Sequence, residues 1–232
     1  MDPEIAEDVS PEQLDRTARQ RLRTLTKDNS DRVAKHLIMA GRLIDDEPEV
    51  AYEHAHSALR RAGRVDIVRE AVALTAYATA RYAEALRELR TVRRLSGVDA
   101  HRAIEADCER GLGRPERAIA LASASPSDGQ SPDDRVELAI VVSGARLDMH
   151  EPEAALLALE SPLVASTRDP ELRLRVDEAR VTVLRALGRD EEASALEATF
   201  PAEAAGTEEE SGDDEVVMSD LEDEALPPGS DR

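Results

Sequence analysis

Aromatic residues are almost absent from this sequence of 232 residues, which has three Tyr, one Phe and no Trp. Its apolar residues are mainly Ala, Leu and Val. Alanine has the highest helix propensity, and its small side chain lets helices approach one another closely. A core of Ala and Leu with few aromatics or Ile therefore indicates packed helices and argues against sheets.

Cysteines and long apolar runs are also scarce. Cys108 is the only cysteine, which excludes an intramolecular disulfide and a Cys-rich zinc site. The sequence begins without the basic and apolar regions of a secretory signal, and no apolar run approaches the roughly 18 residues of a membrane span. We therefore expect a cytoplasmic protein with no membrane partner.

Motifs that carry catalytic chemistry are missing as well. The sequence has no HExxH, no phosphate-binding loop, no dinucleotide-binding glycine pattern and no nucleophile elbow. His54 and His56 are two residues apart, so from one helix they cannot chelate one metal. Cys108 lies beside two acids, which raise the pKa of a thiol and disfavour a thiolate. We expect no catalytic residue, cofactor or metal, and we do not expect an enzyme.

Charge is distributed unevenly along the chain. The formal net charge of −20 argues against nonspecific phosphate binding by the whole molecule. Residues 201–232 hold twelve acids and one base, and residues 1–15 hold six acids and no base. Residues 60–102 instead hold ten Arg against five acids. The chain thus has acidic ends and a basic segment inside.

A small residue recurs at regular intervals, each time early in a segment of helical periodicity. These marker alanines are spaced by 34, 33, 37 and 38 residues, and they are Ala51, Ala85, Ala118, Ala155 and Ala193. Apolar residues on either side of the markers recur at steps of three and four, which predicts amphipathic helices. We expect each marker to face a partner helix at close range.

The residues before the markers predict a tight turn that enters a second helix. Pro48, Pro115 and Pro152 suit the first helical position, where the missing N–H has no intrahelical partner, and Glu follows each of them. Gly113 and Gly188 stand where a first helix would end. The equivalent place in the other units is held by Asp46, Ala80 and His150.

This pattern resembles the tetratricopeptide repeat, whose unit is about 34 residues long. The resemblance covers about residues 31–200, with a lead-in helix near 11–26, although the consensus Trp is absent throughout. Residues 106–118 resemble small actinobacterial tetratricopeptide proteins. The resemblance implies a bacterial cytosolic protein, and it implies an all-α right-handed solenoid of about five helix-turn-helix hairpins.

The expected organisation has three parts. Residues 1–10 form an acidic disordered N-terminus, residues 11–200 a tetratricopeptide-like domain, and residues 201–232 an acidic disordered tail that cannot bury enough apolar surface to fold. Polar stretches at 123–134 and 161–170 predict loops between hairpins. The hairpins are expected near 31–62, 65–96, 99–124, 134–161 and 170–199.

The resemblance also implies where a partner would bind, because the first helices of such hairpins line a concave surface. Residues carried over to that surface mix both signs of charge, which suits a protein or peptide partner of mixed charge. The Lys/Asn set that clamps the C-terminal carboxylate of chaperones is absent, since its places hold His36, Ala40, Glu70 and Leu74, so chaperone tails are not expected partners. The groove candidates are His36, Glu70, Tyr77, Asp107, Arg110, Glu137, Arg175, Glu178 and Arg185.

Three functional interpretations remain open at this point. The leading one is a protein–protein interaction scaffold or adaptor, the common use of stacked hairpins. The alternative is a nucleic-acid- or ribonucleoprotein-associated factor that uses the Arg-rich segment 60–102, masked by the acidic tail. The scarcity of aromatics argues against base stacking. A third interpretation has the tail pair with the Arg-rich hairpin without any nucleic acid.

Overall fold

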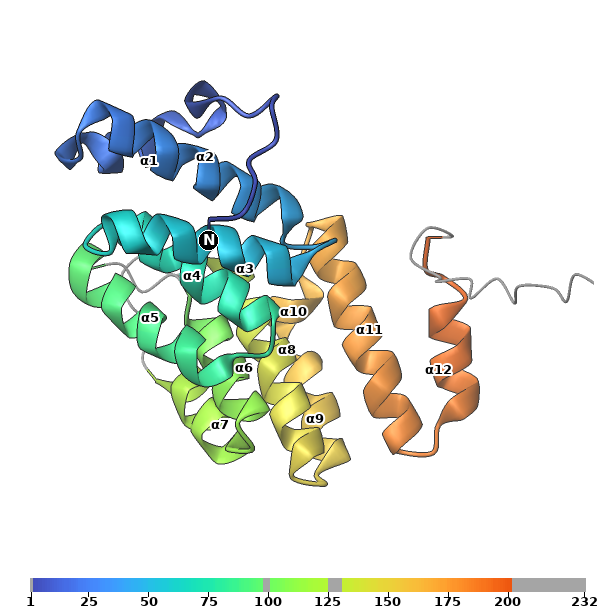
Figure 1. The fold of residues 1–232 in the computed structure, drawn as a ribbon. Coiled ribbons are helices and arrows are strands. Elements are labelled where there is room, and N and C mark those ends of the chain that lie inside the picture. The colour runs from blue at the N-terminus through green and yellow to red at the C-terminus, as the bar shows by residue number, and fades with distance from the viewer. Residues whose placement is uncertain (1, 98–100, 125–130, 202–232) are drawn as a thin grey trace, which may run out of the picture. The chain divides into compact units, whose positions relative to one another are not determined.

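A computed structural model gives the fold of the protein and describes residues 2–97, 101–124 and 131–201. This part of the chain is all helical, with twelve α-helices, two short 3₁₀ helices and no strand (Figure 1). The helices lie within Met1–Thr199, the first of two units into which the chain divides. The disordered tail is expected at residues 201–232. All of these residues except 201 lie outside the described part of the chain.

Ten of the helices pack as five successive pairs joined by short turns. The pairs span 27–62, 66–96, 102–123, 132–159 and 170–197, beside the hairpins expected near 31–62, 65–96, 99–124, 134–161 and 170–199. Their helices are α2 (Lys27–Leu43) with α3 (Pro48–Ala62), α4 (Asp66–Ala78) with α5 (Tyr82–Ser96), α6 (Arg102–Gly111) with α7 (Pro115–Ser123), α8 (Pro132–Asp148) with α9 (Pro152–Leu159), and α11 (Pro170–Ala186) with α12 (Asp190–Glu197).

Each pair also packs on the next one along the chain. The second helices α3, α5 and α7 contact the following first helices α4, α6 and α8, and α11 packs against both α8 and α9. First helices contact each other too, α2 with α4 and α8 with both α6 and α11. We call the surface formed by α2, α4, α6, α8 and α11 the first-helix face (Figure 1).

The marker alanines are buried in the second helices of the pairs. All five, Ala51, Ala85, Ala118, Ala155 and Ala193, have an exposed fraction of 0%. A larger side chain at such a place would force the two helices apart, because protein interiors are already close-packed. The recurring small residue therefore has the packing role that its spacing predicts.

Four of the five intra-pair turns have a residue with positive φ at the same position of the turn. Gly113 and Gly188 have φ of 71°, and Ala80 and His150 have φ of 56° and 61° at the same place. In each case the next residue donates its N–H to a carbonyl five residues earlier, as Arg81 does to Ala76, which satisfies a helix-end carbonyl. Asp46 does not take this conformation, and the α2–α3 turn is longer.

The N-terminal segment differs from the expectation of disorder. Asp2 accepts hydrogen bonds from Arg60 and Arg61 of α3, and Asp8 accepts one from Arg42 of α2 at 2.8 Å. Val9 is 2% exposed. The prediction of a disordered segment 1–10 is therefore wrong for residues 2–10, because their acids pair with arginines far along the chain and one apolar side chain is buried.

Two further segments depart from their predicted form. The lead-in helix near 11–26 is broken into η1 (Pro11–Gln13), α1 (Arg16–Arg21) and η2 (Leu22–Thr24), because the Asp15 carboxylate caps a new helix by accepting two backbone N–H bonds. The predicted loop 161–170 contains the one-turn helix α10 (Pro162–Ala165). There the Ser161 hydroxyl caps the helix, and proline occupies its first position.

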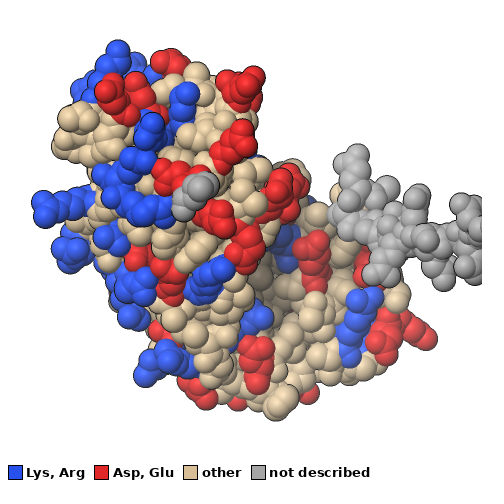
Figure 2. Space-filling model, viewed as in Figure 1, with Lys and Arg blue, Asp and Glu red and all other residues tan. Residues whose placement is uncertain are grey.

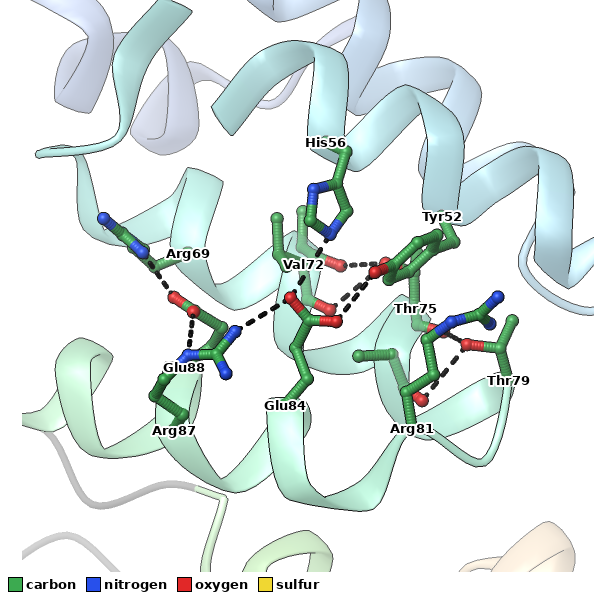
Figure 3. A network of polar contacts seen from close by, with 12 residues as sticks. Tyr52, His56, Arg69, Val72, Thr75, Thr79, Arg81, Glu84, Arg87 and Glu88 are labelled. Atoms are coloured by element: carbon green, nitrogen blue, oxygen red, sulfur yellow. Dashed lines mark hydrogen bonds and ion pairs between the residues drawn. The ribbon is translucent and has the colours of Figure 1, made fainter. Parts of the chain in front are cut away.

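Buried glutamates tie neighbouring helices together through arginines, most of which belong to the basic segment. Glu88 of α5 is 2% exposed and accepts bonds from Arg69 at 2.6 Å and from Arg87 at 3.1 Å (Figure 3). In the same network the Tyr52 hydroxyl donates to Glu84 at 2.7 Å. Glu105 and Glu109 of α6, each 4% exposed, are bound in turn by the arginines Arg93, Arg90 and Arg114. A buried carboxylate needs such partners, since an unpaired charge in the interior is very costly.

Candidate binding surface on the first helices

A cavity of about 640 Å³ opens on the first-helix face, and we call it the central cavity. Four first helices contribute to it, namely α4, α6, α8 and α11. In the view of Figure 2 the surface between α11 and the earlier pairs is hollowed, with acidic and basic side chains beside the hollow. The cavity is lined by Tyr77, His101, Ala103, Ile104, Asp107, Arg110, Asp134, Glu137, Ile140, Val141 and Arg175.

Polar pairs between successive first helices hold the walls in place. The Tyr77 hydroxyl of α4 donates to Asp107 Oδ2 of α6 at 2.6 Å. Arg110 donates to Asp107 Oδ1 on its own helix and to Asp148 Oδ2 of α8, both at 2.8 Å. Arg175 of α11 donates to Glu137 of α8. Each bond except the one within α6 spans about one repeat, so the lining depends on the stacking of the pairs.

A glycine makes room for the Arg110 side chain. A Cβ at Gly144 of α8 would lie 2.8 Å from Arg110 Nη1 and 3.0 Å from its Cζ, closer than nearly all real Cβ contacts. The guanidinium therefore lies close to the α8 backbone at Gly144, and from there it reaches Asp148. Gly144 thus leaves the space that the cavity residue Arg110 occupies, which its sequence position alone does not predict.

Burial changes the acid–base properties of several lining groups. Burial is the main cause that raises the pKa of Glu137, opposed by the Arg175 guanidinium. The pKa of Tyr77 is raised by burial and by its hydrogen bond to Asp107, so this hydroxyl stays a donor. The hydrogen bond with Glu70 raises the pKa of His101, whose Nε2 lies 2.8 Å from Glu70 Oε1.

The cavity brings together five of the nine groove candidates, Tyr77, Asp107, Arg110, Glu137 and Arg175. Glu70 lies beside it, where it binds His101, and lines a smaller apolar cavity between α2 and α4. Glu178 and Arg185 are exposed on α11 without lining the central cavity, and Arg185 is bound to Glu197 of α12.

His36 requires a correction. Its side chain is 1% exposed and points to α3, where its Nδ1 lies 3.0 Å from Nδ1 of His54, itself 0% exposed. A side chain buried within the first pair cannot contact a partner on the first-helix face. The error is one of register, since position 36 lies on the side of α2 that packs on α3.

Other members of the cavity lining were not predicted from the sequence. Ile104 precedes Asp107 by three residues, and Asp134 and Ile140 lie three residues on either side of Glu137. Residues three or four apart share a helix face, so helical spacing from the predicted residues was the signal that could have found them. His101 precedes the first residue of α6, where this spacing gives no guide.

Other kinds of site are not evident in the part of the chain that the structure describes. Those residues contain no cluster of three or more His, Cys, Asp or Glu that could hold a metal ion. None of the described helices is long and apolar enough to span a membrane. Burial, followed by the charge of Asp107, raises the pKa of the Cys108 thiol to about 12.

Comparisons with protein-family models, with curated proteins and with solved structures give no match to this chain.

Proposed function

We propose that this protein is a tetratricopeptide-like helical-repeat scaffold that binds a protein or peptide partner along the first-helix face. The observation that carries the proposal is the central cavity, which four successive first helices line with both aliphatic and hydrogen-bonding side chains. Its volume of about 640 Å³ falls within the range of about 300–1,000 Å³ that is usual for ligand pockets. Stacked helix pairs commonly present such surfaces to extended partners.

The nucleic-acid alternative has less support. In the described part of the chain, carboxylates bind seven arginines of segment 60–102, and these are Arg60, Arg61, Arg69, Arg81, Arg87, Arg90 and Arg93. A phosphate would have to compete with those carboxylates, several of which are buried and would be left without their partner. Arg81 also stacks on Tyr52, with its guanidinium carbon 4.2 Å from the ring centroid.

Display of random dodecapeptides on the purified chain tests the proposal. Recovered peptides are measured by fluorescence anisotropy against wild type and against the variant Glu137→Ala/Arg175→Ala, which removes an ion pair of the cavity wall. The matched control is Arg189→Ala/Glu192→Ala, which removes an exposed ion pair at the start of α12, outside the first-helix face.

We expect binding to weaken about tenfold or more in the cavity variant, because hydrogen bonds to charged groups are worth about 1.5–3 kcal/mol, and to stay unchanged in the control. Failure to enrich any peptide, or equal binding by both variants, would show that the first-helix face is not the binding site.

A further inference from the structure

The charges around the central cavity are unequal. Three carboxylates line it, Asp107, Asp134 and Glu137, against two guanidinium groups, Arg110 and Arg175. Two more carboxylates hold lining residues from the side, since Asp148 binds Arg110 and Glu70 binds His101. The surroundings are therefore negative, and a cation is attracted more strongly than an anion.

The guanidinium groups are also engaged, while carboxylate oxygens remain available. Arg110 is held between Asp107 and Asp148, and Arg175 binds Glu137 Oε1. Asp134 Oδ2 accepts the Ser131 N–H in a capping box. The second oxygens of Asp134 and Glu137 accept no hydrogen bond from the described residues, although each carboxylate can accept several.

The two available carboxylates lie on one side of α8, and aliphatic side chains lie beside them. Asp134 and Glu137 are three residues apart, so they share a helix face. Ile104 of α6 and Ile140 and Val141 of α8 line the same cavity. A long basic side chain suits this combination, because it packs its methylene stem on apolar surface and presents its charge to acceptors.

We propose that the central cavity takes an arginine side chain of the partner segment, with the guanidinium bound by Asp134 and Glu137 and the stem packed on Ile104 and Ile140. Arginine is favoured over lysine because its planar group offers five donors and can bridge two carboxylates. Glu137 is shared with Arg175, whose side chain is 51% exposed and has solvent to move into. This inference rests on the proposed function and adds the chemistry of the bound residue.

Oriented peptide pools provide the test. Three fluorescein-labelled hexapeptide pools carry arginine, citrulline or glutamate at one fixed position and mixed residues elsewhere, so that the flanking sequence does not decide the result. Citrulline has nearly the shape of arginine without its charge. Binding to the full chain is measured by anisotropy at low and at moderate salt.

The arginine pool should bind about tenfold or more tightly than the citrulline pool, and added salt should reduce the difference. The variant Asp134→Asn/Glu137→Gln should abolish this preference, while its Asn oxygen can still accept the capping bond. The variant Asp190→Asn/Glu191→Gln removes the same two charges from the exposed first turn of α12 and should keep the preference.

Equal binding of the arginine and citrulline pools would overturn the inference, and so would the same loss of preference in both double variants. Tighter binding of the glutamate pool, lost in Glu137→Ala/Arg175→Ala, would refute the arginine assignment and leave the first-helix face as a binding surface. If none of the pools binds and display also enriches no peptide, the inference and the proposed function both fail.

Discussion

The buried histidine pair should make the stability of the first helix pair fall as the pH falls. His36 and His54 are 1% and 0% exposed, and their Nδ1 atoms are 3.0 Å apart. One Nδ1 must donate and the other accept, so at least one ring is neutral. Burial, and next the proximity of His54, lowers the pKa of His36 from 6.5 to about 4. Burial also lowers the pKa of His54, whose Nε2 is buried without a hydrogen-bond partner in the described chain.

The sign of the effect follows from where the proton binds. Between about pH 6.5 and pH 4 the unfolded chain protonates His36 and the folded chain does not, so protonation favours the unfolded state. The stability that the neutral, buried His36 contributes is fully present above the pKa of His36 in the unfolded chain, and it is lost as the pH falls towards 4. Asp2 opposes the shift at His36, while Arg60 and Arg61 add to it, so the N-terminal segment takes part.

The magnitude follows from the pKa values. One pKa unit corresponds to about 1.4 kcal/mol, so a shift from 6.5 to about 4 is worth about 3 kcal/mol once the pH is below both values. Between about pH 7.5 and about pH 5 the loss is about 2 kcal/mol. Most carboxylates stay ionised in that range, which separates the histidine effect from general acid denaturation.

Urea unfolding followed by far-UV circular dichroism measures the effect across that pH range. The variant His36→Leu/His54→Leu replaces both partners by apolar groups of similar size, so it should fold and should lose about 2 kcal/mol less than wild type on acidification. His150→Asn is the control, since this histidine is exposed and Asn tolerates its positive φ. A wild type and a double variant with the same pH dependence would refute the reasoning.

Three other predictions address the repeat itself. Ala80 and Gly113 both have positive φ, which glycine adopts more easily than alanine. Ala80→Gly should therefore stabilise the chain by about 0.5–1 kcal/mol in urea unfolding, and Gly113→Ala should destabilise it by about 1 kcal/mol. Opposite signs would contradict this account of the turns. Ala118→Leu should cost about 1–3 kcal/mol, whereas Ala120→Leu on the exposed side of α7 should cost little, and equal costs would exclude a packing role for the marker. Cys108 should react with Ellman's reagent only as the chain unfolds, since its thiol is buried and burial raises its pKa to about 12. Rapid reaction of the folded chain would instead show that α6 opens locally.

Local features of this fold were predictable from sequence. The marker alanines are small because two helices pack closely there, and the turn residues adopt a left-handed backbone. Both requirements act within a few residues of the chain. Ala118 and Gly113 belong to one such segment, and both have the expected role in the structure. Helix periodicity likewise anticipated the all-helical architecture.

Features that depend on distant partners were not predictable in this way. Asp2 binds Arg60 and Arg61 nearly sixty residues away, so the composition of residues 1–10 alone suggested disorder. The candidate site was found in part, because Asp107 and Glu137 follow from helix register, whereas His36 does not. A rotation of α2 about its axis by one residue position decides whether the His36 side chain lies on the first-helix face or packs against α3.

The buried glutamates of α6 also limit how this protein can evolve. Stacked helix pairs are often regarded as modules that can be added or deleted. Here Glu105 and Glu109 of α6 are bound by Arg93 and Arg90 of the preceding pair. Deleting the third pair would remove the carboxylates that hold these two arginines, and inserting a copy after it would bury two glutamates without those partners. A change in the number of pairs at this place would therefore require compensating charge substitutions, because a buried carboxylate left without a partner is costly.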